Sequence, residues 1–82
     1  MQLATERLAS LPRDRMLNVL RDLLRQVFVA RYDGANYERL ARAHGYADGF
    51  MRALLESGIV EQRDLLTIVN EERRKAFDQV AA

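Results

Sequence analysis

The sequence predicts an all-α protein, a small single domain over residues 1–82 built as a bundle of four to five helices. Apolar residues recur every three or four positions through most of the chain, and no run alternates as a half-buried strand does. Gly34, Gly45 and Gly58 stand where this helical pattern is expected to stop. With 82 residues, the chain has room for one domain.

The first nine residues predict a short, frayed helix that presents Leu3, Ala4, Leu8 and Leu11 on one side. A long central helix follows over about residues 11–32, with Ser10 as its N-cap and Pro12 in its first turn. Its apolar residues fill an arc of about 180°, wider than the ~100° stripe of a helix with one solvent-exposed side. This helix must therefore be covered on two sides.

The wide apolar arc predicts contacts either within the domain or with a second copy of the chain. A chain of this length buries a thin core, and association with another chain is one way to gain buried area. We therefore expect a protein interface on the long helix. Its predicted residues are Leu17, Leu20, Leu24, Val27 and Phe28.

After a turn at Asp33 and Gly34, two short helices are expected. The first runs from Asn36 to His44 and ends at Gly45, while the second begins with Asp48 as N-cap and ends at Gly58. Together they predict a corner over about residues 36–57.

Ile59 and Val60 are too few for a strand and are expected to plug the core. The last helix is predicted over about residues 61–80. Its basic residues lie late, in the order that suits the helix dipole. The stretch from Leu54 to Val69 is similar to the helix, Gly-Ile-Val corner and helix of many adaptor domains, which implies an architecture only.

The sequence offers few side chains that could carry out catalysis or bind a metal ion. The chain has no cysteine and one histidine, so neither a thiolate site nor an imidazole cluster can form. Glu71 and Glu72 are adjacent and are expected to point about 100° apart on a helix, too far to share a substrate. We expect no enzyme activity, no metal, no cofactor and no small-molecule substrate.

No apolar run approaches the ~20 residues of a bilayer-spanning helix, and the N-terminal stretch has no basic segment followed by an apolar one. The sequence thus predicts no membrane partner and a cytoplasmic location. The formal net charge of +1 gives no global field that would attract nucleic acid.

The stretch LARAHGYADGFMRAL, residues 40–54, resembles the helix-turn-helix of small transcriptional regulators. The resemblance rests on Leu40 and Ala41 in the first helix, Gly45 in the turn, and Met51 and Leu54 anchoring the second helix. It implies a tri-helical domain in which the second helix enters the major groove of DNA. The residues implied at the nucleic acid are Arg39, Arg42, Asp48 and Arg52.

Two hypotheses follow from the sequence. The leading one is a non-enzymatic helical protein–protein interaction or adaptor module that self-associates through the long helix and docks a partner between helices. The alternative is a DNA-binding transcriptional regulator with Arg39, Arg42 and Arg52 at the nucleic acid.

Overall fold

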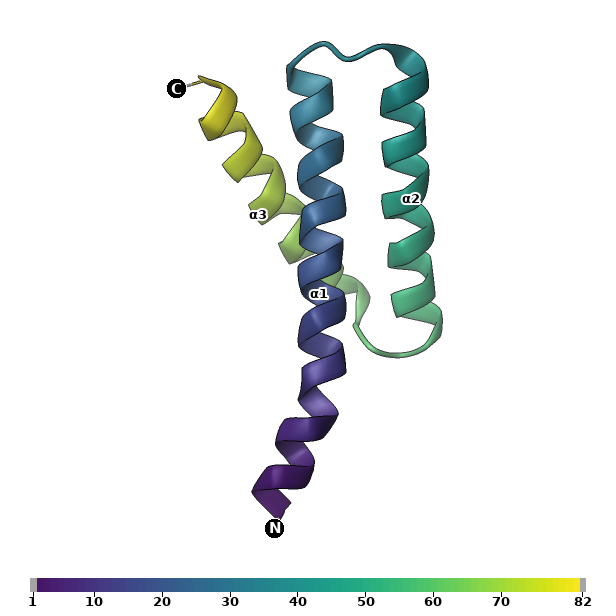
Figure 1. Cartoon of the computed structure of the whole chain (residues 1–82), viewed down its shortest axis with the longest axis vertical. Coiled ribbons are helices and arrows are strands. Elements are labelled where there is room, and N and C mark those ends of the chain that lie inside the picture. Colours follow the sequence, from purple (N-terminus) through teal and green to yellow (C-terminus); the bar gives the residue numbers. More distant parts are fainter. Residues whose placement is uncertain (1, 82) are drawn as a thin grey trace.

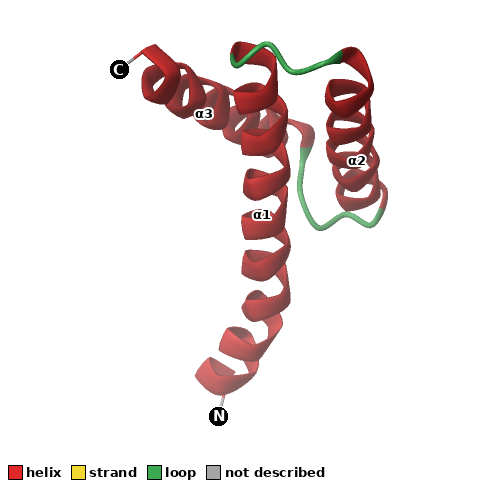
Figure 2. Cartoon of the chain, turned by 45° about the horizontal axis from the view of Figure 1, so that its top comes forward, coloured by secondary structure: helices red, strands yellow, loops and turns green. Residues whose placement is uncertain are grey.

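The computed structural model describes the backbone of residues 2–81 and the side chains of residues 12–79 and 81. Three α-helices make up this range, and no strand occurs within it (Figures 1 and 2). They are α1 (Gln2–Tyr32), α2 (Tyr37–Glu56) and α3 (Gln62–Ala81). The predicted all-α class is confirmed, whereas the predicted number of four to five helices is wrong.

The first correction concerns α1, which begins at Gln2 and passes through Ser10 and Pro12 without a break. A proline ring removes one backbone hydrogen bond but holds φ near the helical value, so a helix can continue through it with a bend. The predicted short first helix and long central helix are therefore one element. In both views its N-terminal part bends and extends beyond the other two helices (Figures 1 and 2).

The second correction concerns the corner predicted over residues 36–57, which is one continuous helix, α2. Gly45 has no positive φ, and Asp48 is not an N-cap but an interior residue of α2. A glycine in a helix interior is unfavourable by only about 1 kcal/mol relative to alanine, which packing readily outweighs. That packing comes from core-facing residues that keep helical spacing straight through Gly45: Leu40, Ala43, Ala47, Phe50, Met51 and Leu54.

The two loops lie where the sequence predicted them. Gly34 and Gly58 both have φ +74°, a conformation that glycine adopts without steric cost. The side chain of Asn36 caps α2 by accepting a hydrogen bond from the backbone N–H of Arg39 at 2.9 Å. At the other end, the N–H of Gly58 donates to the carbonyl of Leu55 at 3.1 Å. The predicted role of Val60 is confirmed, because its side chain is buried in the core.

α1 is the helix on which the other two pack. α2 runs antiparallel beside it and α3 crosses it on another side, whereas contacts between α2 and α3 are sparse (Figure 1). Leu20 has no exposed surface and lies in the core cluster that all three helices share.

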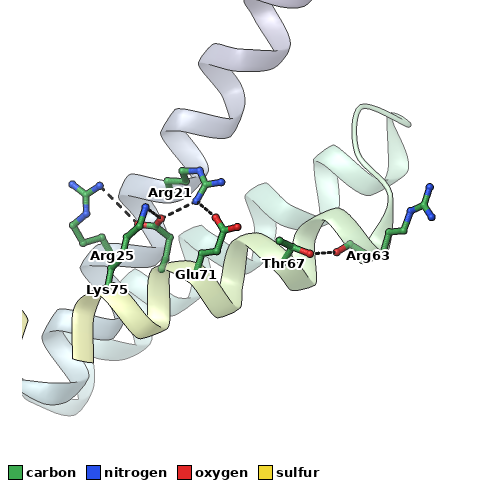
Figure 3. Close-up of polar contacts among 7 residues, drawn as sticks. Arg21, Arg25, Arg63, Thr67, Glu71 and Lys75 are labelled. Atoms are coloured by element: carbon green, nitrogen blue, oxygen red, sulfur yellow. Dashed lines mark hydrogen bonds and ion pairs between the residues drawn. The ribbon is translucent and has the colours of Figure 1, made fainter. Parts of the chain in front are cut away.

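A buried carboxylate joins α1 to α3. Glu72 is 1% exposed, and its Oε2 accepts a hydrogen bond from Arg21 Nη1 at 2.9 Å. The same Arg21 nitrogen lies 2.9 Å from Glu71 Oε2, so both adjacent carboxylates contact one guanidinium (Figure 3). Lys75 Nζ lies 3.3 Å from Glu72 Oε2. The hydrogen bond that Arg21 donates to Glu72 is the largest influence on the guanidinium and raises its pKa.

Candidate functional site

The predicted interface residues of the long helix lie in the core. Leu20, Leu24, Val27 and Phe28 are 0 to 9% exposed, and Leu17 is partly buried against them. α2 and α3 cover the wide apolar arc from its two sides, so these side chains have almost no surface to offer a partner. Of the two ways to cover the arc, packing within the chain is the one observed.

What remains accessible is a depression between α2 and α3, here called the α2–α3 groove. It consists of two adjoining hollows that share Met51 and Val69. The hollow near the loop that joins α2 to α3 measures about 380 Å³ and is lined by Asp48, Met51, Arg52, Leu55, Gln62, Leu65, Leu66 and Val69. The second measures about 210 Å³ and is lined by Leu24, Val27, Phe28, Arg31, His44, Ala47, Met51, Val69 and Arg73.

The apolar character of this groove follows from the helical spacing of its walls. Met51 and Leu55 are four residues apart on α2, and Leu66 and Val69 are three apart on α3, so each pair lies on one side of its helix. Leu55 is 39% exposed and Leu66 is 56% exposed, large fractions for leucine side chains. Leu55 and Leu66 are thus open to solvent on the two walls, while the floor of the groove consists of buried core side chains.

The smaller hollow, of about 210 Å³, has a cationic edge. Arg31, His44 and Arg73 line it, and no carboxylate lies among its lining residues in the described part of the chain. Arg73 Nη2 donates to Asn70 Oδ1 at 2.6 Å, and neither Arg31 nor Arg73 forms an ion pair with a described residue. In the other hollow, Arg52 Nη2 lies 4.0 Å from Asp48 Oδ2. The groove therefore combines an apolar floor with positive charge at one end.

The four residues predicted at nucleic acid do not lie on one surface. Asp48 and Arg52 line the α2–α3 groove, whereas Arg39 and Arg42 line a different groove. On one continuous helix, Arg39 and Arg52 are thirteen positions apart, which separates them by about 20 Å along the axis. Ala47, the residue directly before Asp48, is 2% exposed and belongs to the core.

The second groove, here called the arginine groove, was not foreseen as a whole. It measures about 450 Å³ and is lined by Arg25, Gln26, Val29, Ala30, Arg39, Arg42, Ala43, Tyr46 and Gln79. The sequence carries part of the signal, because Arg39, Arg42 and Tyr46 share one side of a helix at spacings of three and four. The participation of Arg25 and Gln79 depends on how α1 and α3 pack beside α2.

Two other features, a metal-binding cluster and a membrane-spanning helix, do not occur in the described part of the chain. No group of three or more His, Cys, Asp or Glu side chains is arranged to hold a metal ion there. None of the described helices has the length and apolar character needed to cross a membrane. Comparison of the chain with protein-family models, with curated proteins and with solved structures found no match.

Proposed function

We propose that this chain is a non-enzymatic protein-interaction domain, which binds an amphipathic helix of a partner protein in the α2–α3 groove. The observation that carries the proposal is the groove itself, whose two walls carry the exposed Leu55 and Leu66 beside Met51 and Val69. A helix laid between α2 and α3 would complete a four-helix arrangement around one core.

A helix suits the groove because its two walls are helices that rest on a third. Apolar side chains at positions i, i+3, i+4 and i+7 of a bound helix form a continuous stripe. Such a stripe would cover Leu55 on one wall and Leu66 on the other, both of which are otherwise exposed to water. The gain in free energy is about 25 cal/mol for each Å² of apolar surface removed from water.

The edge charges favour a partner helix with acidic residues beside its apolar stripe. Arg31 and Arg73 have guanidinium groups without a carboxylate partner among the described residues, and a guanidinium pairs with a carboxylate through two parallel hydrogen bonds. Charge pairs at an interface edge act mainly on specificity and association rate. Binding should therefore weaken as salt is added.

The test uses two synthetic helical peptides with the same leucine stripe, one flanked by glutamates and the other by lysines. We expect the glutamate peptide to bind more tightly, and its complex to weaken in Leu66→Glu, where a charge enters the groove wall. The matched control is Val19→Glu, because Val19 is also partly exposed, at 41%, and does not line the groove. Equal binding of both peptides, or equal loss in both variants, would refute the proposed site.

Self-association, which the sequence predicts, is tested in the same material. Sedimentation equilibrium of the wild-type chain and of Leu66→Glu reports whether a second copy fills the groove. A monomeric wild type is expected if the groove serves a different partner. A dimer that Leu66→Glu converts to a monomer would instead identify a second copy as the occupant.

A further inference from the structure

We infer that the arginine groove is a binding site for a ligand that carries two or more phosphate groups. The inference rests on the juxtaposition of Arg25 from α1 with Arg39 and Arg42 from α2 around one depression. It is independent of the proposed protein-docking function, because the two grooves share no lining residue.

The charge of the arginine groove is only partly compensated. None of its described lining residues is acidic. Arg25 has two acidic neighbours, since its Nη1 lies 3.4 Å from Asp22 Oδ1 and its Nη2 lies 3.8 Å from Glu72 Oε1. Arg39 and Arg42 form no ion pair with any described residue. Two guanidinium groups in the groove thus have no carboxylate to neutralise them.

The start of α2 contributes a partial positive charge, which the carboxylate of Glu38 in the same turn opposes. Arg39 lies in the first turn of α2, where the aligned peptide dipoles place a partial positive charge. The backbone N–H of Arg39 already donates to the side chain of Asn36, so this contribution is one of field and not of a free donor. The guanidinium groups remain the direct ligands, and their planar forks match phosphate oxygens in pairs.

The groove also has room for the non-phosphate part of a ligand. Its volume of about 450 Å³ lies in the range of small-molecule sites. Val29, Ala30 and Ala43 give it an apolar floor, and the Tyr46 ring is 67% exposed beside it. A ring of the ligand can therefore lie against Tyr46 while its phosphates face the arginines.

A short phosphate-bearing ligand fits better than a DNA duplex. A single carboxylate would engage one arginine and leave the others without a partner, whereas two or three linked phosphates can engage all three. A duplex would need a longer row of cations, yet Arg52 lies in the other groove beside Asp48. Two or more phosphates in a row are therefore the chemistry that these three arginines recognise.

The test is a titration of the isotopically labelled chain, followed by NMR, with tripolyphosphate and with a nucleoside triphosphate. Salt is kept at about 0.1 M, where distant exposed charges are screened. We expect the largest shifts at residues 25–30 and 39–46. In the double variant Arg39→Gln/Arg42→Gln, affinity should fall about tenfold or more, since each hydrogen bond to a charged group contributes on the order of tenfold.

The matched control is Arg15→Gln/Arg63→Gln, which removes the same charge from exposed positions outside both grooves. It should bind tripolyphosphate as the wild type does, and thermal melts should show all variants folded. Tighter binding of the nucleoside triphosphate, lost in Tyr46→Ala, would assign the ligand's ring to Tyr46, whereas equal affinity would assign recognition to the phosphates alone.

Three results would overturn the inference: no binding of either ligand, equal weakening in the control variant, or binding of duplex DNA without binding of tripolyphosphate. Leu66→Glu should leave phosphate binding unchanged. The proposal for the α2–α3 groove and the inference for the arginine groove can therefore be refuted independently of each other.

Discussion

Replacing Gly45 by alanine distinguishes a continuous α2 from a helix-turn-helix corner. If Gly45 ended a helix in the left-handed conformation, a Cβ would be strained there, and alanine would destabilise the protein. In the structure Gly45 is an interior helical residue with no positive φ. The two arrangements predict opposite signs for the change in stability.

The magnitude follows from the surroundings of Gly45. A Cβ built there meets no heavy atom within 4 Å, so the substitution has no steric penalty. Alanine is favoured over glycine in a helix interior by about 0.8–1.0 kcal/mol. For a domain of this size that gain raises Tm by about 3–8 °C. Gly49→Ala, also open and interior, should give a similar increase.

Gly58→Ala is the matched control, because Gly58 also has open space around it but has φ +74°. There the left-handed conformation makes alanine unfavourable by about 1–2 kcal/mol. Thermal and denaturant melts followed by circular dichroism measure all three variants. A loss of stability in Gly45→Ala comparable to that in Gly58→Ala would refute the continuous helix.

Three further predictions concern the core and the alternative function. Arg21→Met leaves the 1% exposed Glu72 carboxylate facing only Lys75 and Arg25, and should lower the free energy of unfolding by about 2–3 kcal/mol. Glu72→Met removes the buried charge itself and should change the free energy of unfolding by less than about 1 kcal/mol. Denaturant melts measure both variants. A larger loss in Glu72→Met than in Arg21→Met would contradict this order. Leu20→Ala, at a position with no exposed surface, should lower the free energy of unfolding by about 2–5 kcal/mol, and a change below about 1 kcal/mol would show that Leu20 is not central to the core. Because Arg52 lies apart from Arg39 and Arg42, Arg52→Ala should leave any low-salt binding of random duplex DNA unchanged in a fluorescence titration; a marked loss would restore the DNA-binding alternative.

Gly34, Gly45 and Gly58 show how far sequence patterns determine the fold. Gly34 follows Asp33 and Gly58 precedes two adjacent apolar residues, so at both places the helical period is interrupted by the neighbours as well as by the glycine. At Gly45 the apolar period continues, and packing of α2 on α1 decides in favour of helix. The glycine alone carried the wrong prediction because its intrinsic penalty is small compared with the burial of a whole helix face.

The candidate grooves were predictable only in part for a related reason. The width of the apolar arc on α1 correctly required cover on two sides, but a sequence does not state whether that cover comes from the same chain. Likewise, Arg39 and Arg42 could be placed on one side of a helix from their spacing. Their proximity to Arg25 depends on the register of α1 against α2, which only the folded chain fixes.

Because α2 and α3 each pack on α1 and barely on each other, the two outer helices can detach separately. Amide hydrogen exchange should therefore be slowest in α1, around Leu20 and Leu24, since these protons exchange only when both outer helices open. Detachment of α3 alone would uncover Leu65, Ile68 and Ala76, which are buried in the folded chain, and would open α3 to proteolysis. A partner helix bound between α2 and α3 would couple the detachment of one outer helix to that of the other. Binding would therefore protect the whole domain from proteases.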